Sequence, residues 1–412
     1  MEPLVNTVRP YAWGSTTALP GLLGVAPDGR PQAELWMGAH PGAPSLVRRP
    51  EGDLPLDAVI EAAPAAELGD AVLRRFGARL PFLLKLLAAD APLSLQVHPD
   101  LAQAAVGFRI ENAAAVPLDA PHRNYRDDNH KPEMVVALGE FEGLCGFRTP
   151  GECAGLLSAL RVAGLDPHCV ALRTHPEEEE ALRAVFSAFL APSPALVAAV
   201  AEAVAREARS DGPHQKDFAL YDRVARAHPG DAGLLAALML RTVRLAPGEG
   251  LFLGAGVPHA YVRGLAVEIM AASDNVLRCG LTAKHVDTAE LLRVVRFDAP
   301  PVRVVRPAPD GPEEVYPAPV DDFRLSRVRV AEGGPAVVLD ATAPHILVCT
   351  RGRVRLSGPR GVVPLGAGGS AYAPAGERVA VDGDGELYRA TVDTGAPRAR
   401  VDASIHPYSE AP

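Results

Sequence analysis

Most of the side chains that could carry out chemistry stand in three short segments: residues 96–100, 130–133 and 258–261. The first segment overlaps the end of a stretch, residues 92–98, in which apolar and polar side chains alternate. Alternate side chains of a β-strand share one face. Ser94, Gln96 and His98 would therefore point away from the core, and we interpret their face as one wall of a polar cavity.

The same segments offer ligands for one divalent metal ion. His98 and His259 supply imidazole nitrogen, Glu133 a carboxylate and Gln96 an amide oxygen. Nitrogen and oxygen donors without thiolate suit zinc, and also manganese, cobalt or nickel. One carboxylate leaves a dipositive ion with residual positive charge, so the ion could polarise a carbonyl or hydroxyl group and stabilise a developing enediolate.

A second group of charged residues follows in residues 268–284. Glu268 stands among apolar residues, where burial would raise the pKa of an unpaired carboxyl group. A salt bridge to Arg263 or Arg278 explains the same pattern equally well. Arg278 and Lys284 could bind a phosphate, or could be solvated surface charges.

Lysine is rare in this chain. Lysine and arginine total 41, but the sequence holds only four lysines, and three of them lie in or beside the segments above: Lys85, Lys131 and Lys284. Because a lysine ammonium is a compact charge with a movable pKa, these positions are candidates for a functional cluster.

Composition limits the class of protein. The chain has 412 residues, is 48% hydrophobic and 22% charged, and its length predicts two or three domains. A net charge of −9 without a basic stripe argues against nucleic-acid binding. No signal-like start or long apolar run is present, and the five cysteines are scattered as in a reducing compartment. We expect a cytoplasmic protein without membrane or nucleic-acid partners.

The secondary structure that the residue pattern predicts changes along the chain. Residues 1–150 predict short strands and turns with little helix, whereas residues 151–240 repeat apolar residues at helical spacing. Strands are expected again in residues 241–298, with a helix over residues 285–296. The Pro-rich residues 299–319 are expected to form a linker, and residues 320–412 return to short strands and glycine turns.

A weak internal repeat links the two strand-rich parts. Leu245, Gly248 and Phe252 recur 120 residues later as Leu365, Gly368 and Tyr372. At the same offset Val379 stands where the earlier part has His259. The last part is therefore predicted to be a second barrel without metal ligands.

The chain resembles type I mannose-6-phosphate isomerases (phosphomannose isomerases), which are zinc-dependent cupin enzymes. The matching segments, in family order, are residues 11–15, 33–38, 93–100, 124–134, 258–261 and 268–287. The resemblance implies a mainly β fold with a helical insertion and two cupin (jelly-roll) barrels. The expected parts are a catalytic domain (1–150 plus 241–298), the helical insertion (151–240), a linker (299–319) and a degenerate C-terminal cupin (320–412).

The resemblance also implies an activity: interconversion of mannose 6-phosphate and fructose 6-phosphate through a cis-enediol, with one zinc ion per chain. The implied metal ligands are Gln96, His98, Glu133 and His259. The implied catalytic residues are Arg278, Lys131, Glu268, Tyr261 and His130, and the implied substrate or phosphate ligands are Lys85, Ser94, Asp274 and Lys284. The base stays open between Glu268 and the His130–Lys131 pair.

Two positions depart from the family pattern. Leu101 stands where the family commonly has lysine, and Ala283 where it commonly has proline. The first change removes a surface charge. The second could loosen the loop that carries Lys284.

Other functions remain open. The chain could be an isomerase for another aldose or sugar phosphate, or a non-catalytic cupin that binds a sugar phosphate. A cupin with two histidines and one carboxylate could also bind iron for oxygen chemistry. The expected partner is a small sugar phosphate, the expected assembly a monomer or small homo-oligomer, and both GDP-mannose synthesis and mannose catabolism fit.

Overall fold

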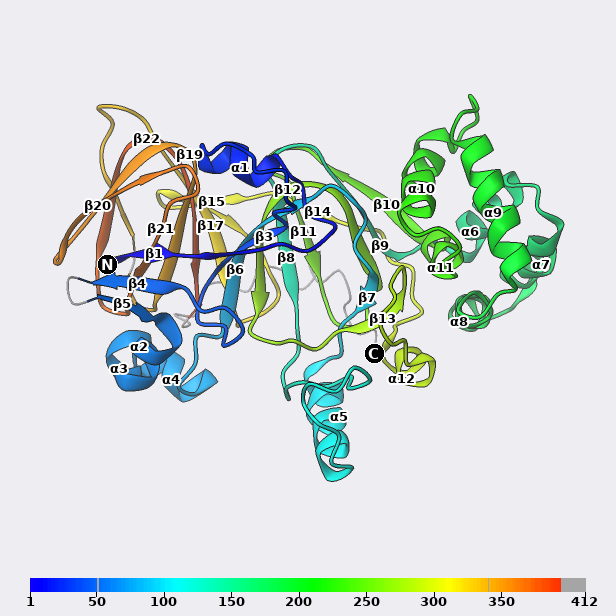
Figure 1. Cartoon of the computed structure of the whole chain (residues 1–412), viewed down its shortest axis with the longest axis horizontal. Helices are drawn as coiled ribbons and strands as arrows, with labels where there is room; N and C mark the ends of the chain where they lie inside the picture. Colours follow the sequence, from blue (N-terminus) through cyan, green and yellow to red (C-terminus); the bar gives the residue numbers. More distant parts are fainter. Residues whose placement is uncertain (50–51, 340, 394–412) are drawn as a thin grey trace.

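The chain forms two adjacent β-barrels with a block of helices at one side (Figure 1). The computed structural model describes residues 1–49, 52–339 and 341–393. The predicted mainly β fold with a helical insertion is confirmed. The part of the predicted C-terminal domain beyond residue 393 lies outside the described residues.

One sheet of eleven strands carries the candidate site, and we call it the first barrel. Its strands are β2 (Thr7–Arg9), β3 (Glu34–Met37), β6 (Phe82–Ala89), β7 (Leu95–Val97), β8 (Glu133–Ala137), β9 (Phe141–Phe147), β10 (Leu240–Leu245), β11 (Gly250–Leu253), β12 (His259–Ala271), β13 (Leu277–Gly280) and β14 (Val304–Val305). The long strand β12 pairs with β7 and β9 near its start and with β6 and β8 near its end. It thereby joins both faces of the barrel.

Strand alternation separates the charges of the first barrel from its apolar surroundings. Val267 and Ile269 of β12 lie in an apolar cluster that both barrels share. Glu268, between them, faces the interior of the first barrel, as do Lys85 of β6 and Glu133 of β8. The period of two along each strand is therefore what brings these charges to one cavity.

Like the first barrel, the second barrel has a long central strand, β22 (Val379–Thr391). Its strands are β1 (Glu2–Val5), β4 (Leu46–Arg49), β5 (Gly52–Pro55), β15 (Ala308–Asp310), β16 (Glu313–Tyr316), β17 (Arg324–Val330), β18 (Val337–Leu339), β19 (His345–Gly358), β20 (Gly361–Gly366), β21 (Ser370–Ala373) and β22 (Val379–Thr391). Val379 pairs with Leu339 in β18, just as His259 pairs with Gln96 in β7. Both Val379 and Leu339 belong to a buried apolar cluster, so this barrel has a packed core where the first has polar side chains, in agreement with the predicted repeat.

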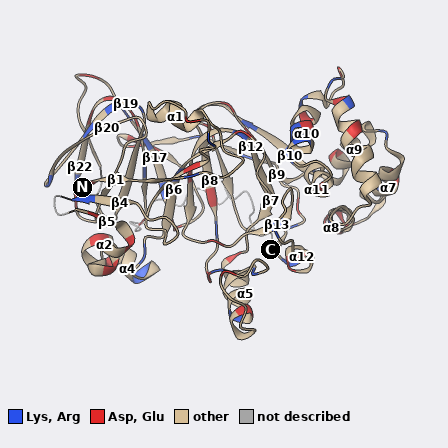
Figure 2. Cartoon of the chain, in the orientation of Figure 1, with Lys and Arg blue, Asp and Glu red and all other residues tan. Residues whose placement is uncertain are grey.

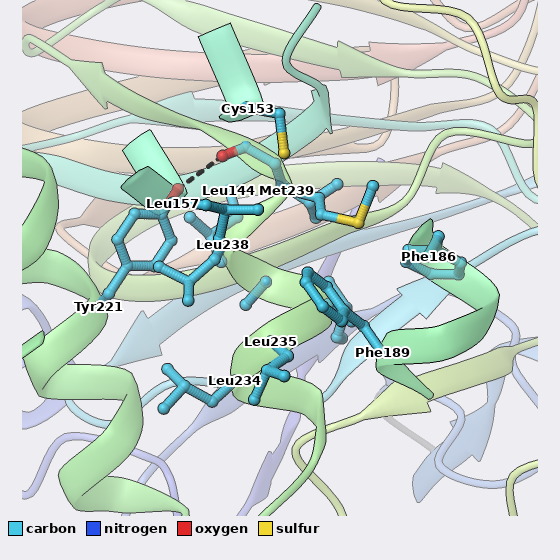
Figure 3. Packing of buried hydrophobic residues seen from close by; sticks show 14 of the residues in the cluster. Leu144, Cys153, Leu157, Phe186, Phe189, Tyr221, Leu234, Leu235, Leu238 and Met239 are labelled. Atoms are coloured by element: carbon cyan, nitrogen blue, oxygen red, sulfur yellow. Dashed lines mark hydrogen bonds between the residues drawn. The ribbon is translucent and has the colours of Figure 1, made fainter. Parts of the chain in front are cut away.

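The helical insertion packs against the outside of the first barrel. Its helices are α6 (Pro150–Ala159), the 3₁₀ helix η1 (Ala163–Leu165), α7 (Asp166–Thr174), α8 (Glu178–Phe189), α9 (Pro194–Glu207), α10 (Gln215–Ala227) and α11 (Gly233–Leu238). Figure 3 shows Phe186, Phe189 and Leu235 packed in its core, which also includes Leu144 of β9. Because barrel and insertion share this core, the insertion is anchored rather than loosely attached.

Other helices correct the expectation of little helix in residues 1–150. They are α1 (Ala18–Leu23), α2 (Leu56–Ala62), α3 (Pro64–Leu68), α4 (Asp70–Phe76) and α5 (Leu101–Ala113), and α12 (Thr288–Val294) follows β13. The longest, α5, starts at a capping box: Gln103 N–H donates to the Asp100 carboxylate at 2.7 Å, and Asp100 N–H donates to the Gln103 side chain at 2.9 Å. That start signal stands in the sequence itself.

The segment expected to be a linker also contains strands. Within residues 299–319, β14 pairs with β11 of the first barrel, and β15 and β16 extend the sheet of the second. Glu2 of β1 pairs with Tyr372 of β21, so the chain begins its strands in the second barrel. The division into domains at residues 150, 240, 298 and 319 stays a prediction.

Charges are mixed over the chain. Figure 2 shows Lys and Arg interspersed with Asp and Glu along both barrels and the helical block. Within the described ranges, no single helix has the length and apolar character needed to cross a membrane; α8 and α9 meet that test only as a pair, bent by 106°.

Candidate active site

A cavity of about 570 Å³ opens into the first barrel. Ten of the residues predicted from the sequence line it: Lys85, Ser94, Gln96, Lys131, Glu133, Tyr261, Glu268, Asp274, Arg278 and Lys284. His98 and His259 are fully buried and lie against Glu133. Twelve of the thirteen predicted positions therefore gather at one place.

Strand register explains how distant residues meet in this cavity. Gln96 of β7 pairs with His259 of β12 on one side and with Arg278 of β13 on the other. Residues directly opposite on neighbouring strands point to the same face. Pairing of β12 with β6 likewise sets Glu268 opposite Lys85.

Three ligand candidates form a compact buried cluster. One side-chain donor atom each from His98, Glu133 and His259 lies within 4.8 Å of the others. His98 Nε2 is 3.3 Å from Glu133 Oε1, and His259 Nε2 is 3.5 Å from Glu133 Oε2. His98 Nε2 and Glu133 Oε2 are buried without a hydrogen-bond partner among the described residues. Since buried polar atoms are seldom left unpaired, these atoms fit a bound metal ion.

Hydrogen bonds to the far side of each imidazole support the same interpretation. His98 Nδ1 lies 2.7 Å from the carbonyl oxygen of Asn275, and His259 Nδ1 lies 2.9 Å from that of Val257. A carbonyl only accepts, so each Nδ1 carries the proton and each Nε2 offers a lone pair. The Gln96 amide is 3.3 Å from His259 Nε2, and rotation of the amide would turn its oxygen to the same point.

Protonation states in the cluster also suit metal binding. Burial lowers the pKa of His98 to about 4, so its imidazole is neutral at pH 7. Burial alone would raise the pKa of Glu133, but the Lys131 ammonium, 3.1 Å away, holds the pKa well below its usual range. A neutral imidazole and an ionised carboxylate are the forms that bind metal.

A buried ion-pair network forms another wall of the cavity. Lys85 Nζ lies 3.1 Å from Glu268 Oε2 and 3.5 Å from Glu34 Oε1. Trp36 Nε1 donates to the other Glu34 oxygen at 2.6 Å, and its ring lies 5.2 Å from the Lys85 ammonium. The sequence offered Arg263 or Arg278 as the partner of Glu268; both were wrong, because the strand register places Lys85 opposite it.

Burial shifts the acid–base behaviour of this wall. It raises the pKa of Glu268, and the Lys85 charge only partly opposes that shift. Burial and the charge of Glu268 together raise the pKa of Tyr261 well above its usual range. The Tyr261 hydroxyl has no hydrogen-bond partner within the described part of the chain, so it is available to a ligand in the cavity.

Positive charge gathers at the rim. Burial and the charge of Arg126 lower the pKa of Arg278. Burial, Arg278 and Arg126 lower the pKa of Lys284. Mutual repulsion of three cations favours an anion between them. Beside them, Asp274 Oδ1 lies 3.1 Å from His40 Nε2.

Asn275 connects the metal-ligand cluster to this rim. Its side chain donates to the carbonyl oxygens of Asp127 and Asn129, at 2.9 and 2.8 Å, and accepts from Arg126 N–H at 2.7 Å. Its own carbonyl accepts from His98. The loop that carries Arg126 is therefore fixed relative to His98.

His130 is a correction to the predicted site. It does not line the cavity; its Nε2 lies 2.9 Å from Asp322, just before β17 of the second barrel. Neighbouring residues in extended chain point in opposite directions, so Lys131 faces the cavity while His130 faces the second barrel. A proton shuttle formed by His130 is therefore not supported.

Several cavity residues had no predicted role. Glu34 and Trp36 stand two apart on β3, and this alternation inside a matching segment was their signal. Asn275 and Arg126 do not line the cavity; they also lie in matching segments, but only the folded contacts reveal what they do. His228, after α10, lines the cavity without any sequence signal.

Comparison with known proteins agrees with this geometry. Residues 1–150 match the family model described as phosphomannose isomerase type I, catalytic domain. The chain is 41% identical over 399 residues to mannose-6-phosphate isomerase of Escherichia coli (strain K12), which covers 94% of this chain and 99% of that protein. It is 33% identical over 410 residues to that of Bos taurus, covering 92% and 94%.

Solved structures give the same result. A holo, zinc-bound mannose 6-phosphate isomerase superposes with a TM-score of 0.87 at 38% identity, covering 95% of this chain and 99% of the other. A variant of phosphomannose isomerase from Salmonella typhimurium has a TM-score of 0.88 at the same identity. The chain therefore belongs to the type I mannose-6-phosphate isomerase (phosphomannose isomerase) family.

Proposed function

We propose that this chain is a metal-dependent aldose–ketose isomerase that interconverts D-mannose 6-phosphate and D-fructose 6-phosphate through a cis-enediol. One observation carries the proposal: a single cavity combines a metal-ligand cluster, a buried carboxylate and a cationic rim. Isomerisation of a sugar phosphate uses an electrophile, a base and a phosphate site, and this cavity offers a candidate for each.

We propose one zinc ion per chain, bound by His98, Glu133, His259 and the amide oxygen of Gln96. The relative solved with zinc supports this choice. When bound, the ion supplies positive charge that polarises the substrate carbonyl and stabilises negative charge on the substrate oxygens.

We assign proton transfer between C1 and C2 to Glu268. Its carboxylate is 3% exposed and faces the cavity, and its raised pKa brings it closer to the working pH of a general base. Lys85 holds this carboxylate in place. Lys131 and the Tyr261 hydroxyl would hydrogen-bond the substrate oxygens that change charge.

The rim is the proposed phosphate site. Arg278 and Lys284 would bind the phosphate, while Ser94 and Asp274 would hydrogen-bond sugar hydroxyl groups. Lys85 was another phosphate candidate on sequence grounds. Two carboxylates already neutralise its charge, so we assign it to Glu268 instead.

The test is isomerase activity on mannose 6-phosphate before and after chelation, with metal content measured on the same sample. We expect about one equivalent of zinc, loss of turnover on chelation and recovery when zinc is returned. Turnover without metal would contradict the ligand set. Bound metal without turnover would favour a sugar-phosphate-binding protein, and a panel of other aldoses would detect a shifted substrate.

We also propose that the enzyme works in the cytoplasm as a monomer or small homo-oligomer, without nucleic-acid or membrane partners. All five cysteines are buried and free of disulfides, which supports a reducing compartment. Cell fractionation and light scattering of the purified chain would test location and assembly.

A further inference from the structure

The loop between α10 and α11, residues 228–232, joins the helical insertion to the rim of the cavity. His228 lines the cavity and its Nε2 lies 3.0 Å from the carbonyl oxygen of Pro92. The Asp231 carboxylate accepts three backbone N–H groups: from Leu281 at 2.9 Å, Thr282 at 3.0 Å and Gly233 at 2.7 Å. One side chain of the insertion thus binds the backbone of the segment that leads to Lys284.

We infer that Asp231 is a positioning residue for substrate phosphate: it fixes the backbone of residues 281–284 and so places Lys284 at the rim. This inference rests on the proposed function, because it takes the rim as the phosphate site. It also gives the helical insertion a role in the reaction.

The backbone at this segment needs an external anchor. Leu281 has φ of 57°, in the left-handed region that non-glycine residues seldom adopt. Its own N–H is one of the three that Asp231 accepts. Without that acceptor, Leu281 would favour a right-handed or extended conformation, and the direction of the following residues would change.

The helical insertion and the segment that leads to Lys284 pack closely against each other. A Cβ atom added to Gly233 would lie 2.5 Å from Leu281 N, and one added to Gly280 would lie 2.5 Å from Gly233 Cα. Only glycine allows the backbones to approach this closely. The start of α11 therefore rests directly on the end of β13.

Asp231 is itself held by a rigid support. It lies two residues before α11 (Gly233–Leu238), whose Leu234, Leu235 and Leu238 are at most 1% exposed and lie in the core drawn in Figure 3. The segment that it anchors carries Ala283, where the family commonly has proline. A chain without that proline depends more on an anchor such as Asp231 to limit the freedom of the segment.

The experiment compares Asp231→Asn with a control, Asp222→Asn, in the full chain loaded with zinc. Asp222 lies on α10 of the same insertion and pairs with Arg226 at 2.8 Å. For Asp231→Asn we expect KM for mannose 6-phosphate to rise about tenfold, or about 1.4 kcal/mol, with kcat within about twofold of the parent. The inhibition constant of inorganic phosphate should rise in parallel, whereas the control should change neither value.

A double-variant cycle separates positioning from a general structural effect. In a Lys284→Gln background, Asp231→Asn should raise KM by less than about twofold, because the group it positions is already gone. Unchanged KM and phosphate inhibition in the single variant, or equal effects in both backgrounds, would overturn the inference. If the Asn variant does not fold, Asp231→Glu keeps the charge, displaces the carboxylate by one methylene and should raise KM likewise.

Failure of the proposed function would look different. If the parent chain did not isomerise mannose 6-phosphate, calorimetric titration with inorganic phosphate would still test the inference. Weaker phosphate binding in Asp231→Asn than in Asp222→Asn would support it, and equal binding would overturn it.

Discussion

Replacing Glu268 by glutamine tests the proposed base. The parent places Lys85 Nζ 3.1 Å from Glu268 and 3.5 Å from Glu34. Glutamine keeps the shape of the side chain and leaves Lys85 paired with Glu34, so the folded state should lose only about 1–3 kcal/mol. General-base catalysis is worth about 10²–10⁴ in rate. We therefore expect kcat to fall by that factor, about 2.7–5.4 kcal/mol on the barrier, with KM little changed.

The pH profile gives a second readout of the same change. Burial raises the pKa of Glu268 above the ordinary value of a glutamate side chain. The base must be ionised, so kcat/KM of the parent should fall as pH decreases through that raised pKa. Glutamine cannot titrate, and the residual activity of Glu268→Gln should lack this limb.

The assay is conversion of mannose 6-phosphate to fructose 6-phosphate, together with exchange of the C2 proton with solvent. The matched control is Glu34→Gln, which removes the other carboxylate beside Lys85. If the effect came only from disturbing Lys85, both variants would lose similar activity. Equal losses, or Glu268→Gln within about tenfold of the parent in kcat and in proton exchange, would refute the assignment of Glu268 as the base.

Three further outcomes follow from described contacts. Zinc at about 100 times its Kd should stabilise the parent by about 2.7 kcal/mol, whereas His98→Ala should show no zinc-dependent shift in thermal unfolding. Burial and neighbouring arginines lower the pKa of Lys284, so KM should rise as pH increases through that lowered pKa; Arg126→Gln should move this rise to higher pH. Thr149 caps α6 through a capping box, so Thr149→Ala should lower the free energy of unfolding by about 1 kcal/mol, measured by urea denaturation, without changing kcat.

The metal-ligand cluster was predictable because its chemistry is local in the sequence. Gln96 lies in β7 and His98 directly follows that strand, while Glu133 and His259 begin strands of the same barrel. Residue type and strand period were enough to select all four. The helical insertion was predictable for a similar reason, since its apolar residues repeat at helical spacing.

Contacts that depend on strand register were not predictable from spacing alone. Glu268 pairs with Lys85 because β12 runs antiparallel to β6 in one particular register. Shifting that register by one residue would turn every side chain of the strand to the other face. The sequence does not state the register, so nearby arginines were equally plausible partners for Glu268.

The error over His130 has another cause. Adjacency in sequence suggested that His130 and Lys131 act together, but extended backbone turns neighbouring side chains in opposite directions. The short strands β14, β15 and β16 were missed because strands of two to four residues carry little periodic signal. Only pairing with both barrels reveals them.

The pairing of β1 with β21 has a consequence for the order in which the molecule can be assembled. Glu2 and Pro3 are synthesised long before their partners in β21, Tyr372 and Ala371. Contacts between such distant segments form slowly because a long loop must close. The helical insertion relies on local contacts and can form while synthesis continues. The second barrel must wait for β21: β1 can pair with β4 through residues 4–5, but Glu2 and Pro3 lack their partners until then. A nascent chain halted before residue 370 would expose that edge to aggregation.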